Sequence, residues 1–191
     1  MTDEPGRRER KKAATRRSIA DAALRLFLDR GYDRVTVAEI AAEADTAVTT
    51  LFTHFPGGKP ALVFGGDEDR GAALAAAVRG RADGTDVLGA VEAFIHQRGP
   101  FGGDDDPGLR TRLKLVASTP ALRDYARKRW TDCEDALTAA IAEVAGRDLA
   151  DPALRALCRL MLEVPDIAGD APDPEKAVTR IFSQLRDGWD F

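Results

Sequence analysis

The stretch TVAEIAAEADTAVTTLFTHF, residues 36–55, decides the fold because it has the pattern of two short helices joined by a tight corner. Thr36 is a favoured N-cap residue and Glu39 follows three positions later, so each side chain can accept a hydrogen bond from a backbone N–H at the helix start. The apolar residues then recur at the spacing of one helical face. They are Val37, Ile40, Ala41 and Ala44. This spacing predicts a first helix over residues 37–44.

The second helix of the stretch has an outer face of small polar and apolar side chains. Leu51 and Phe55 lie four residues apart and predict its buried face, which leaves Val48, Thr49, Thr50 and Thr53 outside. Two short helices of this kind form a helix-turn-helix, whose second helix enters the major groove of DNA. Such units also occur in all-α proteins that do not bind DNA, so the neighbouring sequence has to decide.

The charge of the chain is unevenly distributed. Residues 1–20 contain seven basic and three acidic residues, whereas residues 60–191 contain 17 basic and 23 acidic residues. A basic segment beside a candidate reading helix supplies the positive charge that DNA phosphates attract. A solvated tail would have the same composition, but its position next to the motif favours DNA binding. We therefore expect the basic arm, Arg7–Arg17, to contact phosphates.

A third helix is predicted before the motif, because apolar residues recur at helical spacing from Ile19 to Phe27 and Gly31 follows as a helix end. Together, TRRSIADAALRLFLDRGYDRVTVAEIAAEADTAVTTLFTHFPGGK, residues 15–59, resembles the N-terminal DNA-binding domain of TetR-family transcriptional regulators. The matching residues are Ala22, Ala23, Leu26, Phe27, Gly31, Tyr32, Thr36, Ile40, Ala41, Ala44, Thr50, Leu51, Phe55 and Lys59.

The resemblance implies a homodimeric, ligand-responsive repressor that binds a palindromic operator in double-stranded DNA. Lys59, beside Pro60, is expected to hold a phosphate, and Val48, Thr49 and Thr50 are expected to read bases. The complete set of candidate DNA-binding residues is Arg16, Arg17, Thr36, Thr46, Ala47, Val48, Thr49, Thr50, Phe52, Thr53, His54 and Lys59.

The sequence departs from the family pattern at the corner and on the reading helix. Asp45 stands at the usual glycine, Thr46 at the usual apolar residue and Ala47 at the usual capping serine. Thr46 is a candidate to cap the second helix and shift its start by one residue. Phe52 replaces a tyrosine, so the phenolic hydroxyl is missing. These changes leave an alternative function open, that of a helical ligand-binding or protein-interaction module that has lost operator binding.

The rest of the chain is predicted to be helical, without an alternating strand pattern. Asp86, Asp151 and residues near Pro174 are expected to start helices, and Pro165 to kink or stop one of them. The remaining expected helices cover residues 60–81, 109–117 and 122–144, with the last helix reaching Trp189. The expected fold is therefore all-α with about nine helices. Its expected domains are a DNA-binding domain over residues 1–59 and an effector-binding and dimerisation domain over residues 60–191.

Two sets of mainly apolar residues in the C-terminal domain are expected to form a dimer interface and a ligand pocket. The resemblance implies a dimer through the final helices, with an interface of Leu154, Met161, Val178, Ile181, Phe182 and Leu185, although these side chains can also pack within their own domain. The candidate ligand pocket is Phe94, Leu113, Tyr125, Trp130, Cys133 and Met161. Large aromatic side chains and an acidic domain favour a small, mostly apolar effector that is not strongly anionic.

The sequence offers little chemistry for catalysis, metals or cofactors. His54 and His96 lack metal-ligand spacing, and Cys133 and Cys158 lie on apolar faces, where cysteine acts as a small hydrophobe. The acidic run at residues 104–106 lacks the alternating ligands of a calcium loop. No apolar span of about 20 residues or signal peptide is present. We therefore expect a cytoplasmic protein that is not an enzyme and that needs no metal, cofactor or membrane.

Overall fold

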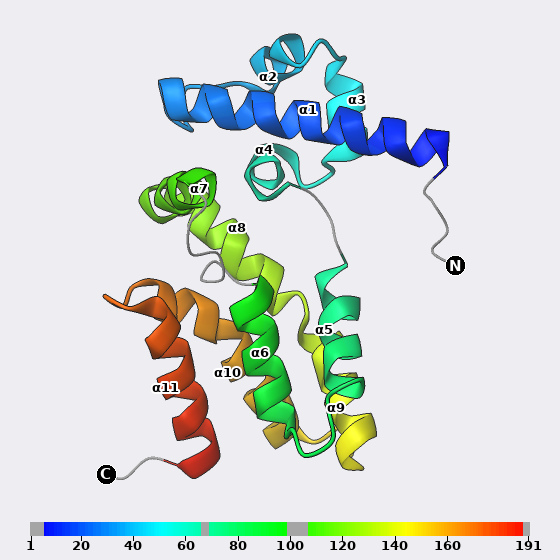
Figure 1. Ribbon diagram of the computed structural model, residues 1–191, viewed down its shortest axis with the longest axis vertical. Helices are drawn as coiled ribbons and strands as arrows, with labels where there is room; N and C mark the ends of the chain where they lie inside the picture. Colours follow the sequence, from blue (N-terminus) through cyan, green and yellow to red (C-terminus); the bar gives the residue numbers. More distant parts are fainter. Residues whose placement is uncertain (1–5, 66–68, 99–106, 189–191) are drawn as a thin grey trace. The chain divides into compact units, whose positions relative to one another are not determined.

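The computed structural model describes residues 6–65, 69–98 and 107–188, and the regular elements in these ranges are all helical (Figure 1). The predicted all-α class is confirmed. The chain divides into two compact units. The N-terminal unit comprises residues 1–67 and 114–122, and the C-terminal unit comprises residues 68–113 and 123–191. Among the described helices, none is long and apolar enough to cross a membrane.

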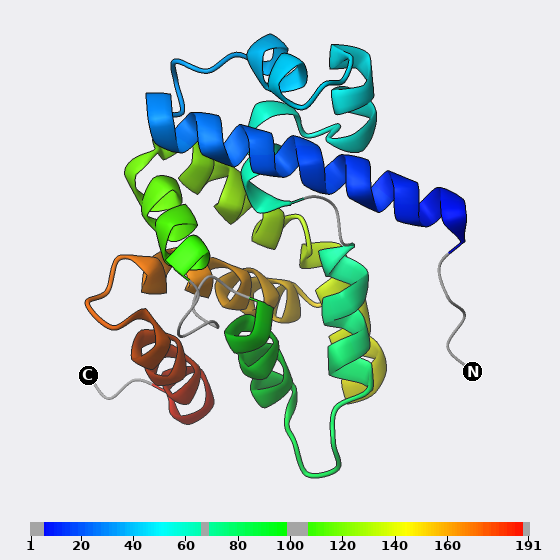
Figure 2. The same ribbon diagram turned by 45° about the horizontal axis from the view of Figure 1, so that its top comes forward.

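The N-terminal unit is organised around one long helix. Helix α1 (Arg7–Arg30) packs against α2 (Val37–Glu43) and against the short 3₁₀ helix η1 (Leu62–Phe64), while α2 contacts α3 (Val48–His54) (Figure 2). A one-turn helix, α4 (Gly58–Ala61), leads into η1. The largest fully buried side chains of the unit come from every part of it; they are Ile19, Phe27, Ile40, Leu51, Phe55, Leu62 and Leu122. The three predicted helices therefore close a core.

The start of α2 has the predicted hydrogen bonds. The backbone N–H of Glu39 donates to the Thr36 hydroxyl at 3.2 Å, and the backbone N–H of Thr36 donates to Oε2 of Glu39 at 2.8 Å. Both halves of the capping box are present, so the prediction is confirmed. The helix covers Val37–Glu43, and Ala44 is its C-cap.

The corner between α2 and α3 differs from the prediction. Asp45 adopts a positive φ of 49°, and the backbone N–H of Thr46 closes the turn onto the carbonyl of Ala41 at 2.9 Å. Helix α3 then begins at Val48 with Ala47 as its N-cap and without a side-chain cap. The predicted capping by Thr46 is wrong, because its backbone N–H belongs to the turn and its side chain precedes the helix by two residues.

The connection after the motif is broken rather than continuous. The sequence predicts one helix over residues 60–81, but η1 ends at Phe64. Its C-cap Gly65 has a left-handed φ of 73°, and α5 (Arg70–Arg79) starts anew with Asp69 as its cap. The side-chain oxygen of Asp69 accepts from the N–H of Ala72 at 2.9 Å. The N-terminal unit consequently extends beyond Lys59, since the side chains that follow it pack on α1. The boundary between a DNA-binding domain and an effector-binding and dimerisation domain at residue 59 stays a prediction.

The C-terminal unit is a bundle of α5, α6 (Val87–Arg98), α9 (Glu134–Ala145), α10 (Pro152–Gly169) and α11 (Pro174–Asp187), joined by most of α8 (Pro120–Thr131). Helix α7 (Pro107–Ser118) is divided between the two units. Within the C-terminal unit, α5 packs on α9 and α6, while α11 packs on α10 and α6. The predicted helix starts at Asp86, Asp151 and Asp173–Pro174 are confirmed, since each aspartate accepts a hydrogen bond from the following turn.

Two predicted helices of the C-terminal unit have different bounds. The stretch 122–144 breaks at Asp132 and Cys133, where Cys133 donates its N–H to the Trp130 carbonyl at 3.0 Å in a tight turn. Asp and Cys are poor helix formers, and the acidic residues that follow favour a new helix N-terminus. Helix α10 continues through Pro165, which does not stop it and is buried. The acidic run at 104–106 and Trp189 lie outside the described residues.

Replacement of Asp45 tests the strain at the corner. Asp45→Gly is expected to raise the free energy of unfolding by about 0.5 kcal/mol, because the release of left-handed strain exceeds the added flexibility of the unfolded chain. Asp45→Ala is the matched control and is expected to lower it by about 1 kcal/mol, since alanine tolerates this conformation less well than aspartate. Urea denaturation measures both values. Equal shifts for the two variants would contradict a positive φ at this position.

Candidate DNA-binding site

Helix α3 presents its predicted outer face to solvent. Leu51 and the C-cap residue Phe55 are fully buried, which holds the helix against the core of the N-terminal unit. Val48 and Phe52 on the opposite side are 39% and 46% exposed. Thr49 and Thr53 are exposed as well, and Thr50 is half-buried. The arrangement leaves a contiguous outer surface that can contact another molecule.

The hydroxyls on this face are not all free. The Thr53 hydroxyl donates to the Thr49 carbonyl at 2.9 Å, one turn back along the helix. Beside it, His54 is half-buried, and its Nδ1 is buried without a hydrogen-bond partner among the described residues. The outer face of α3 therefore offers the methyl groups of its threonines but fewer hydroxyl protons than their number indicates.

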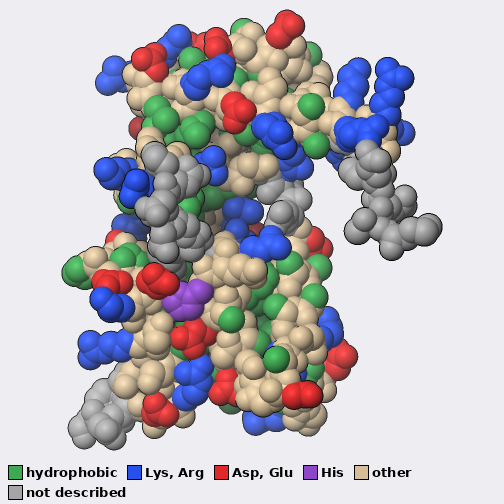
Figure 3. Space-filling view, viewed as in Figure 1, with side chains coloured by type: hydrophobic (Ala, Val, Ile, Leu, Met, Phe, Trp, Pro, Cys, Tyr) green, Lys and Arg blue, Asp and Glu red, His purple; other side chains and the backbone are tan. Residues whose placement is uncertain are grey.

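The basic arm is part of a regular helix. Residues 7–17 form the first three turns of α1, and the first buried side chain of that helix is Ile19. Figure 3 shows Lys and Arg side chains gathered at the N-terminal end of α1. The exposed cations there are Arg7, Arg8, Arg10, Lys11, Lys12 and Arg17. A rigid helix fixes the spacing of these charges, which an unfolded tail would not do.

Arg16 has a different contact from the predicted one. Its Nε donates to the carbonyl of Gly65 at 3.2 Å, and its guanidinium lies 5.1 Å from the centre of the Phe55 ring. The side chain is half-buried, so it ties α1 to the end of η1 rather than pointing outward. The sequence could not show this, because the two hydrogen-bond partners lie 49 residues apart.

Lys59 is also engaged within its own unit. Its ammonium lies 4.1 Å from the centre of the Tyr32 ring and 5.7 Å from that of Phe27. Burial lowers the pKa of Lys59, and the negative charges of Asp33 and Glu39 oppose that shift. The predicted phosphate contact of Lys59 therefore competes with a cation–π contact between α4 and the C-terminal end of α1.

Thr36 is fully used by the capping box. Its hydroxyl accepts from the N–H of Glu39 and donates to Oε2 of the same residue at 2.7 Å, which leaves little capacity for a phosphate. The backbone hydrogen bond from Thr36 is the main reason why the pKa of Glu39 is lowered. Thr46 is half-buried, while Ala47 is exposed at the start of α3.

Two ion pairs that the sequence did not reveal hold α2 on α1. Arg25 contacts Glu43 at 3.0 Å, and Arg30 contacts Glu39 at 3.2 Å. Each pair is exposed, so solvent screening leaves each with little effect on the free energy of unfolding. Both pairs lie between α1 and α2, so they favour the face of α1 that α2 covers.

Most of the candidate ligand-pocket residues lie in the core of the C-terminal unit. Phe94, Trp130, Cys133 and Met161 are buried in one cluster, while Leu113 and Tyr125 are half-buried and do not belong to it. Phe94 meets Trp130 edge to face at 6.3 Å, and the Arg70 guanidinium lies 4.2 Å from the centre of the Trp130 ring.

A pocket of about 690 Å³ lies beside this cluster. Its lining residues are Ala77, Arg81, Ala82, Thr85, Ala90, Ala93, Phe94, His96 and Gln97.

The predicted dimer interface points into its own chain. Leu154, Met161, Val178 and Phe182 are at most 5% exposed within a single subunit, and Ile181 and Leu185 pack partly buried against the same core. The amphipathic pattern of α11 is thus explained by packing on α6 and α10. A different surface is open to a partner, because Leu160 and Ile167 of α10 are 41% and 54% exposed.

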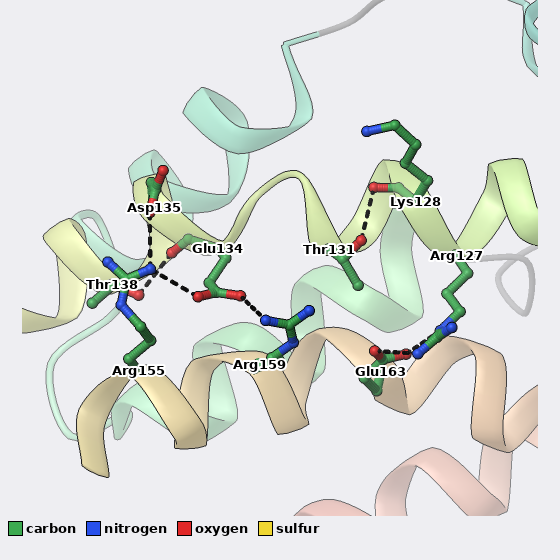
Figure 4. Close-up of polar contacts among 9 residues, drawn as sticks. All are labelled: Arg127, Lys128, Thr131, Glu134, Asp135, Thr138, Arg155, Arg159 and Glu163. Atoms are coloured by element: carbon green, nitrogen blue, oxygen red, sulfur yellow. Dashed lines mark hydrogen bonds and ion pairs between the residues drawn. The ribbon is translucent and has the colours of Figure 1, made fainter. Parts of the chain in front are cut away.

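Ion pairs join α10 to α8 and α9 (Figure 4). Arg155 and Arg159 both contact Glu134 at the start of α9, at 2.9 and 3.4 Å. Arg127 of α8 makes two hydrogen bonds with Glu163, at 2.6 and 2.7 Å. Three of these residues lie on one helix, so α10 is fixed in rotation relative to α8 and α9. The groups of His, Cys, Asp and Glu in the described part of the chain form no cluster suited to a metal ion.

Comparisons with known proteins agree with this architecture. Residues 19–64 match the family model described as bacterial regulatory proteins, tetR family, and residues 85–189 match the MftR C-terminal domain. The transcriptional regulator TcmR of Streptomyces glaucescens is 32% identical over 152 residues, which cover 77% of this chain and 67% of TcmR. The regulator MftR of Mycobacterium tuberculosis is 24% identical over 142 residues, covering 74% of this chain and 71% of MftR.

The fold has a counterpart among solved structures. GusR of Salmonella enterica superposes with a TM-score of 0.51 at 17% identity, covering 90% of this chain and 93% of GusR, which supports the shared fold. The family matches fall on the two parts of the chain that carry the helix-turn-helix and the helical bundle. The chain therefore belongs to the TetR family of bacterial transcriptional regulators, which bind DNA.

Proposed function

We propose that this protein is a homodimeric repressor that binds a palindromic operator through α3 of each subunit and leaves it when a small, mostly apolar ligand binds the C-terminal unit. The observation that carries the proposal is the geometry of α3, which is anchored by Leu51 and Phe55 and exposes its opposite face. A DNA-binding role places the protein in the cytoplasm, where the bacterial chromosome lies, and requires no catalytic activity.

The alternative function, a module that has lost operator binding, rests on the unusual corner. Asp45 nevertheless takes the left-handed conformation that a glycine would adopt, so the turn is preserved. Phe52 remains exposed on α3, where the missing hydroxyl removes one hydrogen bond but not the surface. These two observations favour retained DNA binding.

The basic turns of α1 support a phosphate-binding role. Helix α1 extends 12 residues ahead of Ile19, or about 18 Å at 1.5 Å per residue. Its exposed cations can reach phosphates beyond those beside α3. Within this segment we assign the phosphate contacts to the exposed cations, Arg17 included, and not to Arg16, whose guanidinium is held at Gly65 and Phe55.

The dimer is proposed to form through the outer face of α10. Ala153, Ala156, Leu160 and Ile167 lie at steps of three, four and seven residues, the spacing of one helical stripe. All four are exposed in the isolated subunit. Exposed apolar residues in such a row typically mark a protein contact. A two-fold axis that passes beside this face of α10 would bring the same residues of a second copy against them.

The effector is proposed to enter the pocket beside Phe94. Its volume of about 690 Å³ lies within the range of small-molecule sites. Alanines and Phe94 give it an apolar wall, whereas His96 and Gln97 offer a few hydrogen bonds. A ligand that prefers one conformer of the dimer lowers operator affinity by its differential affinity for the two conformers.

Selection of bound duplexes from random DNA tests the proposal. We expect the purified protein to enrich an inverted repeat whose half-sites lie about one helical turn, or a multiple of it, apart. The bound duplex should contain two subunits by light scattering. Failure to enrich any sequence, with the protein folded and dimeric, would favour the alternative module.

The basic turns of α1 can be tested by neutralising them together. Arg7, Arg8, Lys11 and Lys12 changed to Gln should reduce the slope of log K against log salt by about 0.9 for each phosphate that the variant no longer neutralises, with sequence preference unchanged. Arg180→Gln on α11 is the control for an exposed cation outside the N-terminal unit. A fluorescence-anisotropy titration at several salt concentrations measures the slope. An identical slope in the neutralised variant would show that α1 does not touch DNA.

The dimer face is tested by introducing a charge. Leu160→Glu or Ile167→Glu should convert the dimer to monomers, because each buried, unpaired carboxylate costs roughly 3 kcal/mol or more. Leu149→Glu, at a residue that is 54% exposed between α9 and α10, is the matched control and should remain dimeric. Light scattering measures the mass of each. A dimer that persists in both α10 variants would place the interface on another surface.

A further inference from the structure

The outer face of α3 lacks the side chains that most often read bases by hydrogen bonds. The helix Val48–His54 has the sequence VTTLFTH and contains no Arg, Lys, Asn or Gln. Those residues make the two-bond contacts that identify guanine and adenine in the major groove. Recognition by this helix must therefore depend on hydroxyls, on His54 or on apolar contact.

The hydroxyl and histidine contributions are limited by contacts within the protein. The Thr53 hydroxyl donates its proton to the Thr49 carbonyl at 2.9 Å, so it can accept from a base but not donate to one, whereas its γ-methyl is unengaged. Thr50 and His54 are half-buried. Thr49 is therefore the exposed side chain of this set whose hydroxyl can both donate to and accept from a base.

The outer face of α3 also carries apolar side chains. Val48 and Phe52 lie four residues apart on one side of α3, and Thr49 and Thr53 lie four residues apart beside them. The exposed fractions of Val48 and Phe52 are 39% and 46%. Contact with an apolar partner would remove these side chains from water and favour the bound state. In the major groove, the C5-methyl group of thymine is that partner.

We propose that Val48, Phe52 and the γ-methyl of Thr53 form a methyl-reading ridge that selects thymines in each operator half-site. The inference rests on the proposed function, since it requires α3 to enter the major groove. It adds the chemical basis of sequence choice, which the family assignment does not provide. Contact with the methyl groups removes apolar surface of both partners from water and discriminates thymine from cytosine and uracil.

Substitution of deoxyuridine for thymine isolates the methyl group. Deoxyuridine keeps the base pair and every hydrogen-bonding group of thymine, so a loss of affinity reports the methyl alone. In the duplex recovered by selection, each half-site should contain one or more thymines whose replacement weakens binding about fourfold, the effect of about one buried methyl group. Thymines outside the half-sites serve as internal controls and should show no loss.

Protein variants assign the effect to the ridge. Val48→Ala and Phe52→Ala should each abolish the deoxyuridine effect at one thymine position, because the methyl then has no partner. Leu28→Ala on α1, at a residue with 47% exposure, is the matched control and should keep both affinity and deoxyuridine sensitivity. Circular dichroism verifies that the substitutions leave the fold intact.

Thr53 allows its two groups to be separated. Thr53→Ser keeps the hydroxyl and removes the methyl, whereas Thr53→Val keeps the methyl and puts a second methyl in place of the hydroxyl. We expect the serine variant to bind the recovered duplex about fourfold more weakly than the valine variant. The opposite order would mean that the hydroxyl, and not the methyl, makes the contact with DNA, which would remove Thr53 from the ridge.

The outcomes separate the two proposals. If no duplex is enriched, operator binding fails and the methyl-reading ridge fails with it. If a duplex is enriched but contains no thymine in its half-sites, or if deoxyuridine has no effect at any of them, the ridge is wrong while DNA binding stands. Equal deoxyuridine effects in the Val48→Ala, Phe52→Ala and unmutated proteins would also overturn it.

Discussion

The burial of Leu51 and Phe55 is the constraint on which the reading function depends. A helix as short as Val48–His54 is not stable by itself in water, since helix nucleation is unfavourable. Each fully buried side chain of this size contributes about 1.5–3 kcal/mol relative to an exposed one. The same contacts that stabilise α3 also fix its rotation, so the identity of the outward residues follows from the inward ones.

The corner between α2 and α3 determines the residue at which α3 starts. The positive φ of Asp45 and the hydrogen bond from Thr46 to Ala41 turn the chain within three residues after α2. Because Thr46 does not cap α3, Ala47, at the usual capping position, is its N-cap, and the helix starts at Val48 without a shift. An unusual corner therefore keeps both the helix-turn-helix arrangement and the set of residues that α3 turns outward.

Local signals in the sequence predicted the N-terminal unit well, and the failures have physical causes. The capping box and the apolar spacing involve residues within one or two turns, so the sequence contains them directly. The breaks at Gly65 and at Cys133 fall at residues of low helix propensity, but such residues also occur inside helices, so the sequence does not show which of them ends one. The stripe Val178–Leu185 showed a buried face, but an apolar stripe cannot say whether its own core or a second subunit covers it. In this subunit the core does.

The cations show the same ambiguity between internal and external partners. The sequence predicts phosphate contacts for Arg16 and Lys59, yet each lies over an aromatic ring of its own unit. A guanidinium or ammonium can satisfy either partner, and the choice depends on long-range packing. With these two engaged, the exposed positive charge of the N-terminal unit concentrates on the first turns of α1. Phosphate attraction and base choice are then separated in space, since α1 supplies charge and α3 supplies an apolar face. An operator affinity dominated by α1 would depend strongly on salt, whereas its sequence preference, set by methyl contacts, would not.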